Sequence, residues 1–220
     1  MSAFVFFAVL AAALLHASWN ALIKSGASKF TSMLIMTVLQ GTFGSIIALS
    51  NALPAASVWP WLVASALFHS GYKLFLSYAY EQGDLSRVYP IARGAAPMIV
   101  LALSGFLLSD TLAAFEVIGV LLLGLGILMM ARGAFANGES RRLVPFALGS
   151  AVMTAGYSIV DGLGARVAGD AVLYVAWMFF LDALIFTPVC IAFRGRGVLK
   201  YTKHDWMIGV GAGAASYAAY

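Results

Sequence analysis

The sequence predicts an all-α polytopic membrane protein, and three observations support this fold class. Hydrophobic residues form 62% of the chain and charged residues only 10%, whereas soluble domains carry about 25% charged residues. The mean hydropathy is +0.93. Apolar runs long enough to cross a hydrocarbon core about 30 Å thick follow one another, and none shows the alternation typical of a membrane β-strand. Each run is therefore expected to be a helix, which satisfies its own backbone hydrogen bonds in lipid.

Eight apolar segments are separated by short linkers that contain glycine, proline, serine and charged residues. The segments cover 3–23, 31–50, 58–80, 88–108, 112–131, 143–164, 171–193 and 205–220. The first contains His16, Ser18 and Asn20 and is not preceded by a basic region. We therefore interpret it as a retained helix and not as a cleaved signal peptide.

Polar side chains recur at helical spacing in five of these segments. Ionisable residues are costly in lipid, so we expect these faces to turn toward the bundle interior or a water-filled cavity. In chain order, the faces comprise His16, Trp19, Asn20 and Lys24; His69, Tyr72, Lys73 and Tyr80; Tyr89, Arg93 and Pro97; Thr154, Tyr157, Ser158 and Asp161; and Tyr174, Trp177, Met178 and Asp182.

Two cations on these faces have both a functional and a structural interpretation. Arg93 is always charged, and its planar guanidinium suits a substrate carboxylate or phosphate, or a bond between repeats. Lys73 lies too deep to reach the membrane surface easily. It requires a substrate anion or an internal ion pair, with Asp161 or Asp182 as the partner.

The other members of the faces also leave alternatives open. His16 and His69 are each either proton relays or hydrogen-bonded core residues. Trp19 and Tyr72 either contact a ligand or only pack, and Lys24 lies at a helix end, where it can extend to the membrane surface.

We predict that these faces enclose a substrate cavity at the centre of the bundle. Cationic groups are in excess there, which favours an anionic or zwitterionic solute. The predicted lining residues are His16, Trp19, Asn20, His69, Tyr72, Lys73, Tyr89, Arg93, Tyr157 and Asp161. No catalytic residue and no metal ligand is predicted.

An internal repeat underlies the order of the segments. The stretch "WLVASALFHSGYKLF" (61–75) aligns without a gap with "WMIGVGAGAASYAAY" (206–220), and 16–28 aligns with 154–166. A unit of about 140 residues therefore begins again near Leu143. Because the first unit has five helices, the second is expected to be inverted in the membrane, as in many secondary transporters.

The repeat divides the chain into three parts. Residues 1–132 form a first repeat of five helices, 133–142 a linker, and 143–220 a second repeat of three helices. Counterparts of 88–131 do not follow, so we expect a fragment of a ten-helix protein of about 280–300 residues. A natural eight-helix protein is the alternative.

Basic residues concentrate in alternate loops. Ten lysines and arginines lie in the loops after the first, third, fifth and seventh segments, and only Arg166 lies on the opposite side. The bias of cytoplasmic loops toward positive charge predicts that the odd-numbered loops are cytoplasmic and the N-terminus is outside. We attribute the net charge of +4 to this topology and not to nucleic-acid binding, because no basic run adjoins an aromatic platform.

The sequence has no enzyme signature and no cofactor motif. It lacks a Walker loop, a nucleophile elbow and the paired histidines of a metalloprotease. The single cysteine, Cys190, has neither a disulfide partner nor a set of metal ligands around it. The chain is therefore predicted not to be an enzyme.

The run from 79 to 130 resembles the end of an EamA domain, the repeat unit of the drug/metabolite transporter superfamily. A small polar turn leads into a helix with Pro97, followed by the acidic turn "LSDTL" and a last helix spaced by glycines. The segments "HASWNALIKSG" (16–26) and "VYPIARG" (88–94) are similar to the same family. Family turns usually hold a glutamate where this chain has Asp110.

The resemblance implies a ten-helix inverted-repeat carrier that moves small metabolites, often outward, without ATP. Its members are commonly drawn with cytoplasmic termini, opposite to the charge bias here. We hypothesise a secondary transporter of the cytoplasmic membrane that works by alternating access on a small-molecule substrate. Proton coupling through a histidine or aspartate is left open. A passive channel and a non-transporting scaffold or partner subunit are the alternatives.

Overall fold

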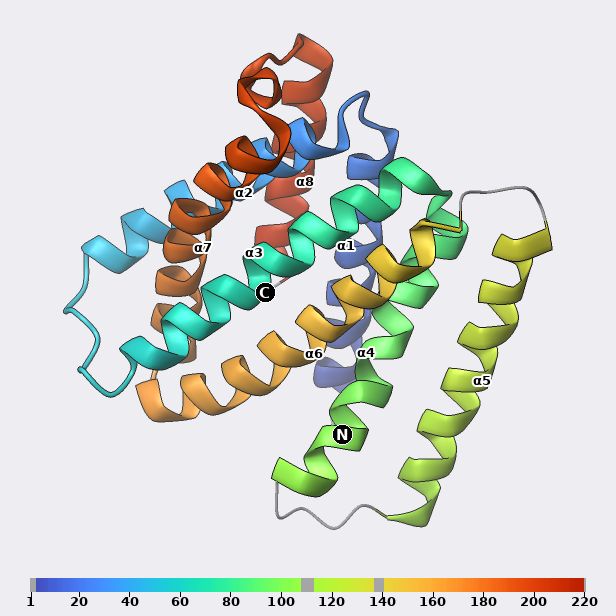
Figure 1. Ribbon diagram of the computed structural model, residues 1–220. Helices are drawn as coiled ribbons and strands as arrows, with labels where there is room; N and C mark the ends of the chain where they lie inside the picture. The colour runs from blue at the N-terminus through green and yellow to red at the C-terminus, as the bar shows by residue number, and fades with distance from the viewer. Residues whose placement is uncertain (1–2, 108–112, 137–140, 220) are drawn as a thin grey trace.

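The computed structural model describes residues 3–107, 113–136 and 141–219, and all regular structure within these ranges is helical (Figure 1). Each predicted apolar segment corresponds to one long helix, which confirms the all-α fold class. The helices are α1 (Ala3–Ser25), α2 (Lys29–Leu49), α3 (Trp59–Gln82), α4 (Leu85–Leu107), α5 (Ala114–Ala136), α6 (Leu143–Ala168), α7 (Ala171–Arg194), the short 3-10 helix η1 (Arg196–Leu199) and α8 (Lys203–Ala218). Within the described ranges, α1, α2, α6 and α7 are each long and apolar enough to cross a membrane.

Helices that are distant in sequence make the main contacts. α3 packs along α6 and α7, and α2 packs along α7 and α8. α1 lies against α8, while α4 covers α6 and α5 packs outside α4 (Figure 1). The candidate site described below therefore lies where α4, from the first half of the chain, meets α6, from the second.

Side-chain caps fix the start of three helices. Ser28 accepts a hydrogen bond from the backbone N–H of Thr31 at the start of α2, and Asp170 does the same for Leu173 at the start of α7. Thr202 and Asp205 form a reciprocal capping box at the start of α8. Each cap satisfies backbone donors that have no partner within the helix.

The turn between α3 and α4 is shorter than the sequence suggests. The polar stretch 81–87 reads as a loop, but only Gly83 and Asp84 lie between the two helices. Lys24 Nζ donates to the carbonyl oxygens of Tyr80 at 2.9 Å and Gly83 at 2.6 Å, so a side chain from α1 satisfies the end of α3. The helix end therefore needs no longer loop, and Lys24 has this role instead of extending to the membrane surface.

Because α4 begins at Leu85, Pro90 lies inside the helix. The predicted segment 88–108 would have placed Pro90 in the first turn. A proline in this position removes one hydrogen bond to the preceding turn. The affected turn is the first of the helix, close to Leu85. Asp110 and its acidic turn lie outside the described residues, as does part of the predicted linker 133–142.

Glycines allow α2 to approach both α7 and α8 closely. A Cβ on Gly44 would lie 2.5 Å from the carbonyl oxygen of Ala176. A Cβ on Gly209 would lie 2.5 Å from Cβ of Ile35, and one on Gly213 3.2 Å from a side-chain atom of Leu39. Gly209 and Gly213, four positions apart in α8, therefore allow close helix packing.

Candidate functional site

A cavity of about 400 Å³ lies among α4, α5 and α6. α4 contributes Arg93 and apolar residues from the turns that follow it, and α6 contributes three polar side chains at helical spacing. The lining residues are Arg93, Ala96, Pro97, Val100, Leu101, Val120, Thr154, Tyr157 and Ser158. The cavity is thus mostly apolar, with its polar groups on two facing helices, as is common for small-molecule sites.

Arg93 is the charged group of this cavity. Its Nη1 donates to the hydroxyl of Tyr157 at 2.7 Å, which joins α4 to α6. Its guanidinium carbon lies 5.7 Å from the ring centroid of Trp19 and 5.4 Å from that of Tyr72. Cation–π contacts of this kind stabilise a charge that has left bulk water. Three aromatic side chains from α1, α3 and α6 therefore position one guanidinium.

Thr154 and Ser158 add hydroxyl groups to the wall formed by α6. The Oγ1 atom of Thr154 is buried and has no hydrogen-bond partner among the residues that the structure describes. The hydroxyl of Ser158 donates to the carbonyl oxygen of Thr154 at 2.8 Å. A ligand in the cavity can therefore satisfy the Thr154 hydroxyl, which otherwise carries a desolvation penalty.

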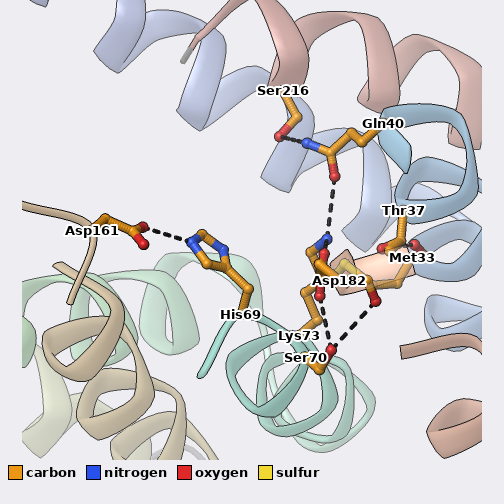
Figure 2. Close-up of polar contacts among 9 residues, drawn as sticks. All are labelled: Met33, Thr37, Gln40, His69, Ser70, Lys73, Asp161, Asp182 and Ser216. Carbon is orange, nitrogen blue, oxygen red and sulfur yellow. Dashed lines mark hydrogen bonds and ion pairs between the residues drawn. The ribbon is translucent and has the colours of Figure 1, made fainter. Parts of the chain in front are cut away.

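His69 packs against Tyr157 on the side away from the cavity. Its ring stacks on Tyr157 with centroids 4.1 Å apart and an angle of 18° between planes. Nε2 of His69 lies 3.0 Å from Oδ2 of Asp161, and the hydroxyl of Tyr174 donates to Oδ1 of the same carboxylate at 3.3 Å. Figure 2 shows His69 pointing from α3 toward Asp161 on α6. His69 is buried, whereas 23% of the Asp161 side chain is exposed.

Lys73 points away from His69, into a second polar cluster (Figure 2). It forms an ion pair with Asp182 on α7 and donates to Oε1 of Gln40 on α2 at 3.2 Å. Ser70 donates to Oδ1 of Asp182 at 2.8 Å, and Gln40 donates to the hydroxyl of Ser216 on α8 at 2.9 Å. This cluster ties four helices together and does not line the cavity. Of the two carboxylates that the sequence offers as a partner for Lys73, the structure selects Asp182.

The polar residues of α1 form a third group. Trp19 Nε1 donates to Nδ1 of His16 at 3.0 Å, and the hydroxyl of Tyr80 donates to Oδ1 of Asn20 at 2.7 Å. Trp19 and Asn20 are fully buried. Tyr89 is half-buried one turn before Arg93 and is not part of the cavity wall.

The structure therefore divides the predicted set of ten residues. Arg93 and Tyr157 line the cavity, and Trp19, Tyr72 and His69 contact those two. The remaining five are His16, Asn20, Lys73, Tyr89 and Asp161. Thr154 and Ser158 belong to the polar face predicted for 143–164, although not to the set of ten, and both line the cavity. Gln40, Ser70 and Ser216 belong to neither. Gln40 is detectable in principle, because it is a lone amide within a long apolar run.

The described ranges hold no group of three or more His, Cys, Asp or Glu side chains that is arranged to bind a metal ion. The described cavity wall offers the guanidinium of Arg93 and the hydroxyl groups of Thr154, Tyr157 and Ser158. These groups bind and orient an ion or a polar solute, and none of them is an activated nucleophile.

The first half of the chain matches a known protein family. The family description "EamA-like transporter family" matches residues 3–132. The chain belongs to the EamA-like transporter family. This confirms the resemblance noted in its sequence. The EamA-like chain is therefore a multi-pass membrane transporter of the drug/metabolite type and not an enzyme.

A solved crystal structure has the same fold as the EamA-like chain. The two superpose with a TM-score of 0.66 at 20% sequence identity, over 100% of this chain and 78% of the other. At this identity the comparison supports the helical architecture alone. Among curated proteins, no sequence gives a significant match.

Proposed function

We propose that this EamA-like protein is a secondary carrier of the cytoplasmic membrane that moves a small anionic or zwitterionic metabolite by alternating access. The main support for this proposal is the position of Arg93. It places a permanent positive charge on the wall of a mostly apolar cavity between the two halves of the chain. Substrate sites of inverted-repeat carriers lie at such an interface, near the middle of the bilayer.

The surroundings of Arg93 favour an anion as substrate. Its hydrogen bond to Tyr157 is to a neutral hydroxyl, and the contacts with Trp19 and Tyr72 are to neutral rings. These contacts orient the guanidinium on the cavity wall. A carboxylate or phosphate in the cavity forms charge-assisted hydrogen bonds, which are about twice as strong as neutral ones. The apolar wall around Pro97 and Val120 suits the uncharged part of the same solute.

The pairing of the helices supports an inverted repeat. The predicted sequence repeat pairs α1 with α6, α2 with α7 and α3 with α8. The contact between α3 and α6 then corresponds to the contact between α8 and α1, and α2 packs against its own equivalent, α7. The cap residues Ser28 and Asp170 give the register of α2 and α7. Gln40 and Asp182 then stand at equivalent positions, each the same number of residues after its cap.

The side chains at these equivalent positions have equivalent partners. Asp182 accepts a hydrogen bond from Ser70 on α3, and Gln40 donates one to Ser216 on α8. The two serines are one residue apart in the alignment of the repeats. Lys73 bonds to both Gln40 and Asp182, so it lies where the two repeats meet. We infer that this cluster is the pivot about which the repeats rock.

The position of His69 supports coupling to protons. A histidine ordinarily changes charge near neutral pH. His69 contacts Tyr157, which binds Arg93, and it is paired with the partly exposed Asp161. A proton arriving at this pair therefore alters the electrostatic environment of the residues that hold the substrate. Among the described residues, His69 contacts the titratable side chains of Asp161, Tyr157 and Tyr72.

A binding and transport experiment tests the proposal. The purified protein is exposed to matched panels of small carboxylates, phosphates, amino acids and amines, and thermal stabilisation is recorded. The proposal expects stabilisation by anions or zwitterions, followed in proteoliposomes by saturable flux and exchange against internal substrate. Stabilisation by amines alone would exclude an anionic or zwitterionic substrate. Flux that neither saturates nor exchanges supports a passive channel instead.

A further inference from the structure

A basic loop and an apolar groove adjoin where α7 is connected to α8. What we call the loop runs from the last residue of α7 through η1 to the first residue of α8, and Arg194, Arg196, Lys200 and Lys203 lie along it. Figure 1 shows this connection beside the start of α2. By the charge distribution of the sequence, this end of the molecule faces the cytoplasm. Juxtamembrane clusters of four or more basic residues attract anionic lipids of that leaflet.

The loop encloses a polar hollow of about 200 Å³ against the start of α2. Two cationic side chains, Arg194 and Lys200, lie on its wall together with the hydroxyl-bearing residues Ser28 and Thr31. Arg194 is bonded to Glu81 at 2.6 Å and stacks on Phe30, with its guanidinium carbon 4.4 Å from the ring centroid. Lys200 is exposed. The positive charge available to a visiting anion is therefore mainly that of Lys200.

An apolar groove of about 350 Å³ continues from this hollow along α2. Val198 belongs to the walls of both. The groove follows α2 from Leu34 to Phe43, and Tyr201 and Trp206 stand on its opposite side with ring centroids 5.7 Å apart. Tyrosine and tryptophan favour the depth of the lipid headgroups. The polar hollow thus lies at the membrane surface and the groove below it, among the acyl chains.

The hollow has a fixed shape. The hydroxyl of Thr31 donates to the carbonyl oxygen of Val198 at 3.1 Å, which attaches η1 to α2. The Thr202–Asp205 capping box fixes the other end of the loop. The basic side chains are therefore displayed by an ordered backbone next to the groove, and not by a freely moving tail.

We propose that this combined surface binds one anionic phospholipid from the cytoplasmic leaflet. Its phosphate lies in the hollow near Lys200 and Arg194, and one acyl chain lies in the groove along α2. Charge complementarity selects an anionic over a zwitterionic headgroup, and the adjoining apolar groove selects a lipid over a free phosphate. The site is on the outer surface of α2 and α8, away from the cavity among α4, α5 and α6.

Native mass spectrometry of the detergent-solubilised protein tests this directly, with phosphatidylglycerol and phosphatidylcholine of the same chain length as competing probes. The wild type is expected to retain one phosphatidylglycerol in preference. Lys200→Gln is expected to lower that preference about fivefold, the loss expected for one basic residue near the membrane. Lys203→Gln is the matched control, because Lys203 is in the same loop but lines neither the hollow nor the groove.

The groove has its own pair of variants. Thr42→Trp fills the groove and is expected to displace the lipid, whereas Ile46→Trp adds the same side chain to α2 outside the groove and is expected to have no effect. An equal loss in Lys200→Gln and Lys203→Gln would show general surface attraction and overturn the proposal. So would binding of glycerol phosphate, which has no acyl chain, as tightly as phosphatidylglycerol.

Discussion

Lys73 on α3 and Asp182 on α7 form an ion pair that is closed off from solvent, with 1% and 0% of their side chains exposed. Such a pair is costly to bury, and its desolvation penalty can exceed the attraction between the charges. Its hydrogen bonds to Ser70 and Gln40 offset part of that cost, because they satisfy the remaining polar atoms. The pair thus specifies how α2, α3 and α7 meet more than it adds to net stability.

Removing one charge of this pair is expected to be much worse than removing both. Lys73→Gln leaves the carboxylate of Asp182 buried without its counterion, and the loss of stability should be about 3–5 kcal/mol. Combining it with Asp182→Asn restores a neutral, hydrogen-bonded pair and should recover most of that loss. Unfolding of the wild type, Lys73→Gln and the double variant in detergent, monitored by the retained monodisperse fraction on heating, gives the comparison.

A surface ion pair on the same helix provides the control. Glu81 bonds to Arg194 with 27% and 37% of the two side chains exposed. Glu81→Gln is expected to cost no more than about 1 kcal/mol. If Glu81→Gln and Lys73→Gln reduce stability equally, the buried pair has no special structural role.

The hydroxyl of Thr154 allows stability and binding to be separated. Its oxygen is buried beside the cavity without a hydrogen-bond partner in the described part of the chain. Thr154→Val keeps the shape and removes this unsatisfied group, so the empty protein should be equally or more stable. Binding of a substrate that uses the hydroxyl should weaken about fivefold, the value of one hydrogen bond. Thermal stability with and without substrate reports both quantities.

Thr37→Val is the matched control for Thr154→Val. Thr37 is also buried, but its hydroxyl donates to the carbonyl oxygen of Met33 at 2.9 Å within α2, away from the cavity. Its loss should affect stability and leave substrate binding unchanged. Equal effects of the two variants on binding would argue against a role of Thr154 in the site.

The sequence predicts the helices well because a long apolar run in a membrane protein has few alternatives to a spanning helix. It also predicts that Arg93 and Tyr157 share a site, since both stand on polar faces of otherwise apolar helices. The sequence does not predict which neighbouring helix each polar side chain of α3 contacts. His69 and Lys73 are one turn apart on α3, yet His69 points to α6 and Lys73 to α2 and α7 (Figure 2).

That division depends on tertiary packing, which helical periodicity does not encode. α3 is surrounded by α6 on one side and α7 on the other, so a single polar face contacts two partners. The short turn at Gly83 has a similar cause. It is completed by Lys24 from α1, and a contact across 59 residues of sequence is not visible in the local pattern.

His69 and Asp161 should separate coupling from binding. His69→Gln removes the titratable ring and retains a polar side chain, and Asp161→Asn removes the charge of its partner. If this pair carries the coupling proton, both variants lose uphill transport driven by a pH gradient but retain exchange of internal for external substrate, which requires no net proton movement. Proteoliposome assays with and without an imposed gradient measure the two activities. Unchanged gradient-driven uptake in both variants would assign coupling to another group.

Arg93 is the decisive residue for the proposed substrate class. Arg93→Gln removes the permanent positive charge that Arg93 places on the cavity wall. The affinity for an anionic substrate should fall about thirtyfold or more, since truncating one partner of a buried charge pair costs roughly 2–5 kcal/mol. Arg93→Lys keeps the charge but not the planar fork, so it should recover part of the affinity for a carboxylate.

Tyr157→Phe removes only the hydroxyl that orients the guanidinium at 2.7 Å and should weaken binding about fivefold. Equilibrium binding of one radiolabelled anion to the four proteins, with the exposed Arg141→Gln as a charge-matched control, measures this order. Equal affinity in Arg93→Gln and the wild type would place the substrate elsewhere in the bundle.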